Sequence, residues 1–109
     1  MKKSWYYMLN VIKEEEISFE RLPHRFISKV MNDEILLYSL NEKVYAVSGF
    51  CPHFGGPLEL KDESLICYWH DWSFDATEFI CTNRKINIKI KKYSVKELFK
   101  NKVRISNEL

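Results

Sequence analysis

The chain has 109 residues, of which 46% are hydrophobic and 15% aromatic, and its formal net charge is +2. This length is enough for one sizeable hydrophobic core but not for two ordinary domains. The apolar content excludes a fully disordered or low-complexity chain. We therefore predict one globular domain over residues 1–109.

The N-terminal stretch resembles a signal peptide only faintly. Two lysines precede a mostly apolar run, but Asn10 interrupts that run, glutamates follow at 14–16, and no small-residue cleavage site is present. No stretch approaches the roughly 18 apolar residues of a membrane span. We expect a soluble cytoplasmic protein without membrane association, and a solvated turn at residues 14–16.

Alternation of β-branched and aromatic residues at period two dominates the chain and predicts short antiparallel strands. Asn32-Asp33 and Asn41-Glu42 have turn chemistry, so residues 25–47 are expected to form a three-stranded meander. Because helical periodicity is scarce, the predicted fold class is all-β. The expected strands are residues 25–31, 34–40, 43–47, 64–68 and 86–95.

Two interpretations stay open after Ser94. The spacing from Ser94 to Glu97 fits a capping box and a short helix, while a hairpin leading into residues 102–106 fits nearly as well. The surrounding segment, residues 83–104, holds nine of the 17 Lys and Arg residues. We interpret it as a lysine-rich strand face that protects sheet edges, with a docking surface for an acidic partner as the alternative.

Glycine and proline concentrate at residues 49–57, where the first of two boxes that combine Cys with His begins. The first box reads Cys51-Pro52-His53-Phe54-Gly55-Gly56, and the second reads Cys67-Tyr68-Trp69-His70-Asp71-Trp72. The 13 residues between His53 and Cys67 are enough for a loop, a strand and a return. Both boxes can therefore meet at one end of a small β unit.

The four side chains of these boxes suit either zinc or an iron-sulfur cluster. Structural zinc sites usually take their ligands as Cys pairs and His pairs. Here each box supplies one Cys and one His, which suits a binuclear cluster with the cysteines on the inner iron and the histidines on the outer iron. We prefer the cluster, with Cys51, His53, Cys67 and His70 as ligands.

The pattern resembles the Rieske family, whose boxes read Cys-x-His and Cys-x-x-His, with a glycine-bearing first loop and a Phe or Tyr before Asp after the second His. Phe74-Asp75 match that last pair, and the resemblance covers residues 51–75. It implies one 2Fe-2S cluster and small antiparallel sheets, with a cluster-binding part at about residues 48–82 inserted in a basal β domain.

Several positions point to a low-potential member of that family. High-potential members are similar but carry hydroxyl side chains at the positions of Trp72 and Phe74. They also carry a disulfide between the loops, where this chain has Gly56 and Tyr68. Asp71 replaces the usual glycine after the second His, and its carboxylate is expected to lower the potential further.

Other residues near the boxes carry smaller predictions. Gly55 and Gly56 are expected to let the loop turn tightly and bring N–H groups to the cluster sulfides. Trp69 and Trp72 either shield the cluster and contact a partner or pack in the core. Trp5 and Tyr45 are expected core residues, and Cys81 is interpreted as a small packed residue, with a ligand or redox switch as the alternative.

The resemblance implies an electron-transfer protein that carries one electron from a flavin- or iron-sulfur-containing reductase to a terminal oxygenase or similar acceptor. The alternative is a component or small subunit of a larger oxygenase or nitrite-reductase-like complex. The mononuclear iron of such oxygenases needs two His and a carboxylate, but beyond the two ligands this chain has only His24, interpreted as a surface residue. Phe54 also stands where those oxygenases carry arginine. We expect no catalytic residue and no nucleic-acid binding.

Overall fold

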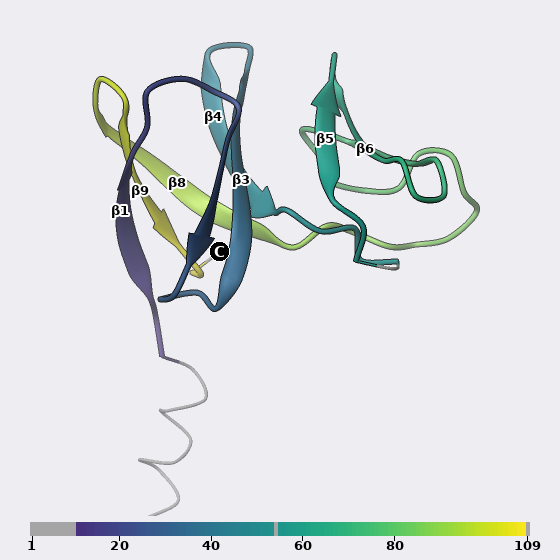
Figure 1. Ribbon diagram of the computed structural model, residues 1–109, viewed down its shortest axis with the longest axis horizontal. Coiled ribbons are helices and arrows are strands. Elements are labelled where there is room, and N and C mark those ends of the chain that lie inside the picture. Colours follow the sequence, from purple (N-terminus) through teal and green to yellow (C-terminus); the bar gives the residue numbers. More distant parts are fainter. Residues whose placement is uncertain (1–10, 54, 109) are drawn as a thin grey trace, which may run out of the picture.

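The computed structural model describes residues 11–53 and 55–108. The predictions for the N-terminal stretch, Trp5 and Phe54 fall outside the described residues. The described part of the chain forms nine strands and no helix, in two antiparallel sheets (Figure 1), which confirms the predicted fold class. Within these residues no helix exists that is long and apolar enough to cross a membrane.

The chain builds a larger sheet and inserts a smaller one within it. The larger sheet has six strands in the order β1-β9-β8-β4-β3-β2, and the smaller has the order β5-β6-β7. The chain leaves the larger sheet after β4 and returns at β8, so both boxes lie in an insertion between neighbouring strands (Figure 1). The strands are β1 (Glu14–Ser18), β2 (His24–Ser28), β3 (Asp33–Leu40), β4 (Lys43–Ser48), β5 (Leu58–Lys61), β6 (Ser64–Cys67), β7 (Trp72–Asp75), β8 (Lys92–Phe99) and β9 (Lys102–Ser106).

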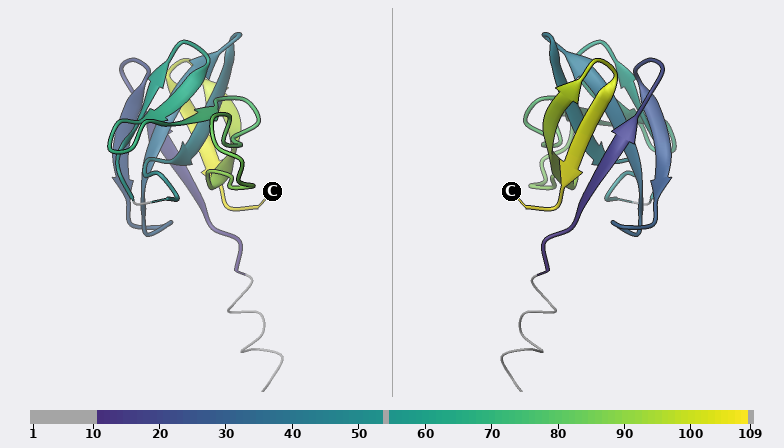
Figure 2. Two further views of the ribbon diagram at one scale, coloured as in Figure 1. Left: turned by 90° about the vertical axis from the view of Figure 1, so that its right-hand side faces the viewer. Right: turned by 90° about the vertical axis from the view of Figure 1, so that its left-hand side faces the viewer.

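The larger sheet curls until its two edge strands approach each other. Ser28 Oγ of β2 donates a hydrogen bond to Glu15 Oε1 of β1 at 2.6 Å. β1 lies beside β9 (Figure 2), where Glu16 forms ion pairs with Arg104 at 2.9 Å and Lys102 at 3.3 Å. The prediction of a solvated turn for these glutamates was wrong, because basic side chains of β9 balance their charge and allow them to form a strand.

The alternating pattern located the middle of the larger sheet correctly. The predicted meander is confirmed as β2, β3 and β4. Its turns place Asn32, Asn41 and Glu42 at φ angles of 54°, 52° and 66°. This is the left-handed region, which Asn tolerates better than most residues.

Three interpretations of the C-terminal part of the chain were wrong. A hairpin follows Ser94, formed by β8 and β9, and the helix alternative was wrong. The strand expected at residues 86–95 begins only at Lys92, because Lys89 instead forms a bridge with Ile80. The basic residues of β8 and β9 lie on inner strands, so they do not protect a sheet edge; the edges are β1 and β2.

Two buried clusters hold the sheets. One fills the curl of the larger sheet and includes Ile35, Leu37 and Ile105. The other joins the two sheets and includes Tyr38 of β3 and Phe74 of β7, with half-buried Tyr45 packed against it as predicted. Tyr38 is fully buried, and its hydroxyl donates to the Ala76 carbonyl at 2.8 Å, which connects the larger sheet to the insertion.

A tight turn after β7 depends on the carboxylate of Asp75. Asp75 Oδ2 accepts hydrogen bonds from Thr77 N at 2.9 Å, Thr77 Oγ1 at 2.6 Å and Glu78 N at 2.7 Å. The Thr77 hydroxyl and these two backbone N–H groups hold the pKa of Asp75 below its usual value. This explains why an aspartate suits the position after Phe74.

We predict that Asp75→Asn lowers stability by about 1 kcal/mol at neutral pH, because the charged acceptor is lost while solvent screens part of its effect. Because folding lowers the pKa of Asp75, its carboxylate stabilises the fold at pH values above its pKa in the unfolded chain, which is about 3.9. This stabilisation is lost as the pH falls through the lower pKa of the folded protein. The difference in melting temperature from wild type should therefore be constant at pH 7 to about 5 and narrow below about 4.

Paired thermal unfolding of the oxidised proteins, followed by circular dichroism, measures this difference. Asp62→Asn, in the exposed β5–β6 turn, is the matched control and should change little at any pH. A difference for Asp75→Asn that stays constant down to pH 3.5 would contradict the role given to the carboxylate.

Candidate metal centre

The first box forms a narrow loop closed at its base by backbone hydrogen bonds. Leu58 N–H donates to the Gly49 carbonyl at 2.8 Å, and Cys51 N–H donates to the Gly56 carbonyl at 2.7 Å. Gly55 N–H donates back to the Cys51 carbonyl at 2.8 Å, and Gly55 has a φ of 76°, which favours glycine. These hydrogen bonds therefore fix the loop on both sides of Cys51 and His53.

Arg25 of β2 holds the base of this loop from outside. Its Nη1 donates to the Gly49 carbonyl at 3.0 Å and pairs with Glu34 Oε2 at 2.9 Å, while its Nη2 donates to the Leu58 carbonyl. A Cβ atom on Gly49 would collide with the guanidinium, so a larger residue there would displace Arg25 from these carbonyls. Arg25 was not predicted as a site residue, because its partners Gly49 and Leu58 lie 24 and 33 residues further along the chain.

The second box forms the turn between β6 and β7. Cys67 ends β6, where it pairs with both Leu58 of β5 and Trp72 of β7. His70 lies in the exposed turn, and Asp71 follows it with a φ of 55°. The left-handed backbone explains why glycine suits this position, and aspartate is among the residues that tolerate it.

The two kinds of box residue differ in their exposure to solvent. Cys51 is 3% exposed and Cys67 is 1% exposed, whereas His53 is half-buried and His70 is exposed. The centroids of the two imidazole rings lie 5.7 Å apart. Withdrawn thiols and surface imidazoles are what a cluster with an inner Cys-bound iron and an outer His-bound iron requires, although the ligand assignment itself stays a prediction.

Gly56 forms the contact between the two boxes. A Cβ atom there would lie 2.7 Å from Cys67 Sγ and 2.8 Å from Trp69 Cδ2, so only glycine fits. His53 N–H donates to Cys51 Sγ at 3.4 Å. The tight turn predicted at Gly55 is confirmed by its φ of 76°, and an N–H bond to the Cys51 sulfur comes from His53; hydrogen bonds to cluster sulfide stay a prediction.

The donor set fits a 2Fe-2S cluster. Two soft thiol sulfurs and two imidazoles are available in the paired boxes, and the close approach of Gly56 leaves the Cys67 sulfur uncrowded by a side chain. In the described part of the chain, no three Cys, His, Asp or Glu residues are grouped so as to hold a single metal ion. A 2Fe-2S cluster of this type needs two protein ligands on each iron, and the boxes supply four.

Of the three aromatic residues of the second box, one is buried and two are exposed. Trp72 is 7% exposed and stacks on the His53 ring, with centroids 3.9 Å apart and planes at 19°. Desolvation, then the nearby His70 and Arg84, lower the pKa of His53, which favours the neutral ring that a metal binds. Trp69 and Tyr68 are 61% and 52% exposed, so Trp69 is available to a partner and Trp72 is not.

The remaining predicted residues lie apart from the boxes or pack beneath them. His24 is half-buried in β2 and stacks on Phe26 at 5.7 Å. Cys81 packs against the cluster that joins the sheets and bridges Phe74, which confirms its predicted role as a packed residue.

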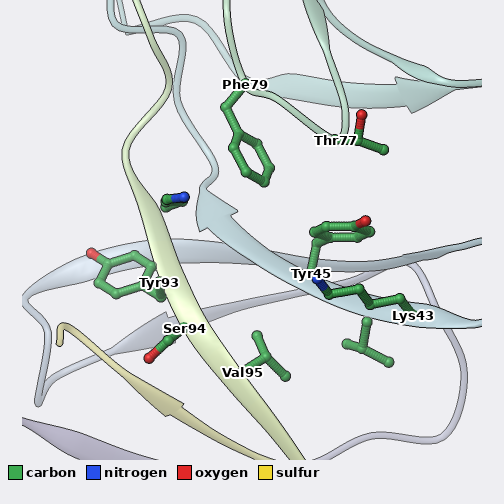
Figure 3. Close-up of a pocket in the computed structure, with 9 residues that line it drawn as sticks. Lys43, Tyr45, Thr77, Phe79, Tyr93, Ser94 and Val95 are labelled. Atoms are coloured by element: carbon green, nitrogen blue, oxygen red, sulfur yellow. The ribbon is translucent and has the colours of Figure 1, made fainter. Parts of the chain in front are cut away.

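A pocket of about 380 Å³ opens where the insertion meets the larger sheet (Figure 3). Its two lysines cover aromatic rings: Lys43 lies 5.2 Å from the centroid of Tyr45, and Lys92 lies 5.5 Å from that of Phe79. No Cys or His lines it, so it is separate from the boxes. It is lined by Lys43, Val44, Tyr45, Thr77, Phe79, Lys92, Tyr93, Ser94 and Val95.

The chain is similar to known proteins in family and in fold. A model of the Rieske [2Fe-2S] domain matches residues 7–94. Cholesterol 7-desaturase nvd of Drosophila melanogaster is 30% identical over 61 residues, which is 52% of this chain and 14% of the desaturase. The chain therefore corresponds to about a seventh of that relative's length.

Two solved structures share the fold. The ferredoxin of carbazole 1,9a-dioxygenase from Nocardioides aromaticivorans IC177 matches with a TM-score of 0.60 and 17% identity, covering 83% of this chain and 95% of that one. A chain in the complex of reduced oxygenase and oxidized ferredoxin in carbazole 1,9a-dioxygenase matches with a TM-score of 0.70 and 16% identity, covering 87% and 94%. At these identities the matches establish the fold alone.

We predict that Gly56→Ala prevents most iron uptake, because its Cβ would displace the Cys67 sulfur. Gly55→Ala is the matched comparison: a Cβ there meets nothing within 4 Å, but the φ of 76° adds strain of about 1–2 kcal/mol. It should keep its iron and melt at a lower temperature. Iron content and thermal unfolding of the purified variants measure both effects, and a fully loaded Gly56→Ala protein would contradict the proposed contact.

Proposed function

We propose, since the chain belongs to the Rieske [2Fe-2S] domain family, that it is a one-electron carrier whose 2Fe-2S cluster is bound by Cys51, His53, Cys67 and His70. The observation that carries this proposal is the difference in burial: both thiols are buried, whereas His53 is half-buried and His70 is exposed. When bound, such a cluster accepts and releases single electrons.

The residues of the chain set the conditions for this chemistry. Cys51 and Cys67 lie among apolar residues, which exclude water from the thiolate side of the site. The His53 N–H bond to Cys51 Sγ withdraws electron density from sulfur and favours reduction. The Asp71 carboxylate at the other end of the site opposes the added negative charge, in keeping with the low potential expected from the sequence.

We place the partner-binding surface around the exposed histidine. Trp69 and Tyr68 supply exposed aromatic area there, and large aromatic side chains often dominate binding energy at interfaces. Arg84 lies next to His70, because it donates to the His70 carbonyl at 2.9 Å, and Lys85 follows Arg84 in the chain. This combination favours acidic partners, which we propose to be a flavin- or iron-sulfur-containing reductase and a terminal oxygenase.

We also propose that residues 1–109 act as one cytoplasmic domain without nucleic-acid or membrane binding. The cluster-binding part is proposed at about residues 48–82. The support for this range is that it includes both boxes and β5 to β7. The residues that follow this range, up to 91, pack against the cluster-binding part, because Ile90 N–H donates to the Phe79 carbonyl at 2.9 Å.

A second candidate is a Rieske component of a larger oxygenase, because the relative cited above is a much longer desaturase. For these 109 residues we propose no catalytic centre. With two histidines assigned to the cluster, only His24 remains, and it stacks on Phe26. Gel filtration of the native protein distinguishes a free carrier from a tightly held component.

We predict that the purified protein is red-brown and contains two irons and two acid-labile sulfides per chain, as expected for this cluster type. Cys67→Ser should abolish the cluster and reduce stability strongly, because bound metal contributes to folding free energy. Cys81→Ala is the control and should keep the absorption spectrum. A colourless protein with one zinc per chain would refute the proposal.

We predict that the surface beside His70 attracts anions. Oxidation of the reduced protein by ferricyanide, an anionic probe, should slow as ionic strength rises, because Arg84 lies next to the histidine and exposed Lys85 follows it in the chain. Lys85→Gln should lower the rate at low salt more than Lys100→Gln, which removes the same charge from the β8–β9 turn on the far side of the larger sheet (Figure 1). Equal effects of the two variants in stopped-flow measurements would contradict a local basic surface.

A further inference from the structure

The side chain of Asn83 bridges two backbone groups of the second box. Its Nδ2 donates to the Asp71 carbonyl at 2.7 Å, and its Oδ1 accepts from Ser73 N–H at 3.0 Å. The neighbouring Thr82 N–H donates to the Ser73 carbonyl at 2.8 Å. The irregular segment at residues 82–83, which follows the turn after β7, therefore holds the exit of the turn that carries His70.

Arg84 holds the same turn one residue earlier and also reaches the first box. Its Nη2 donates to the His70 carbonyl at 2.9 Å, and its guanidinium lies 5.4 Å from the centroid of the Trp72 ring. Trp72 in turn stacks on His53 at 3.9 Å. A column of Arg84, Trp72 and His53 thus couples the two histidines, which come from different loops.

A cation–π contact combined with a directed hydrogen bond suits arginine better than lysine. A guanidinium can cover an aromatic face and donate in its own plane at the same time, whereas a lysine ammonium is a single compact charge. Arg84 is exposed, so water and salt screen its charge partly. Its position is nevertheless fixed by the hydrogen bond to His70 and the contact with Trp72, which sets it apart from the neighbouring Lys85.

We infer that Asn83 and Arg84 are positioning residues for the two histidine ligands, and that the fixed charge of Arg84 raises the reduction potential of the site. The inference rests on the proposed function. Reduction adds one negative charge, which a cation held against both histidine loops stabilises. Arg84 thereby counteracts Asp71, whose carboxylate lies in the same turn and acts in the opposite direction.

The test compares matched variants of the iron-loaded protein by voltammetry and by iron release to a chelator. Arg84→Gln should lower the midpoint potential more than Lys85→Gln, which removes the same charge from the adjacent residue, and the difference should shrink at high salt. Arg84→Lys should keep a potential near wild type but release iron faster. Asn83→Ala should release iron several-fold faster than Asn87→Ala, the matched exposed asparagine, with little change in potential.

Equal potential shifts for Arg84→Gln and Lys85→Gln would overturn the charge effect, and equal iron release by Asn83→Ala and Asn87→Ala would overturn the positioning role. If Arg84→Gln takes up no iron, Arg84→Lys decides: restored iron supports a cation at this position, and continued loss counts against it. Wild-type protein without iron would instead refute the proposed function, so the two failures are distinguishable.

Discussion

One constraint organises the insertion: each box must bury its Cys thiol and leave its His imidazole closer to the surface. The two residues are close in sequence, because His53 follows Cys51 by two residues and His70 follows Cys67 by three. Each box satisfies this constraint by placing the Cys at a paired base and the His towards the turn. Cys51 is paired with Gly56 at the base of its loop, and Cys67 is the last residue of β6. The short spacing from Cys to His in each box is the number of residues from the paired base of the loop to its exposed turn.

Because of this constraint, some backbone carbonyls of the two loops have no partner in a strand ladder. Polar side chains from other parts of the chain donate hydrogen bonds to them. A turn cannot satisfy all of its carbonyls within a ladder, and buried polar groups without partners are costly. Arg25 of β2 donates hydrogen bonds to the carbonyls of Gly49 and Leu58. In the second box, Arg84 donates to the His70 carbonyl and Asn83 donates to the Asp71 carbonyl. Residues outside the boxes thus hold the two box loops in place as much as the boxes themselves.

The local signals in the sequence account for what could be predicted. Spacing alone identified the boxes, and alternation identified β2 to β4. β1 was missed because a run of three glutamates has no apolar alternation, and its partner strand lies at the other end of the chain. The supporting roles of Arg25, Asn83 and Arg84 depend on contacts across long stretches of sequence. No local pattern marks them.

The insertion leaves and rejoins the larger sheet at adjacent points: Ser48 N–H donates to the Lys91 carbonyl at 2.8 Å, and Val47 pairs with Lys92. For the larger sheet, the whole insertion is therefore equivalent to the loop of a hairpin. Lengthening a loop costs little, about 0.6 kcal/mol for each doubling. A redox module attached in this way can be gained, exchanged or grafted between two antiparallel strands without changing their register, provided that the receiving sheet offers an apolar face such as that of Leu36 and Tyr38.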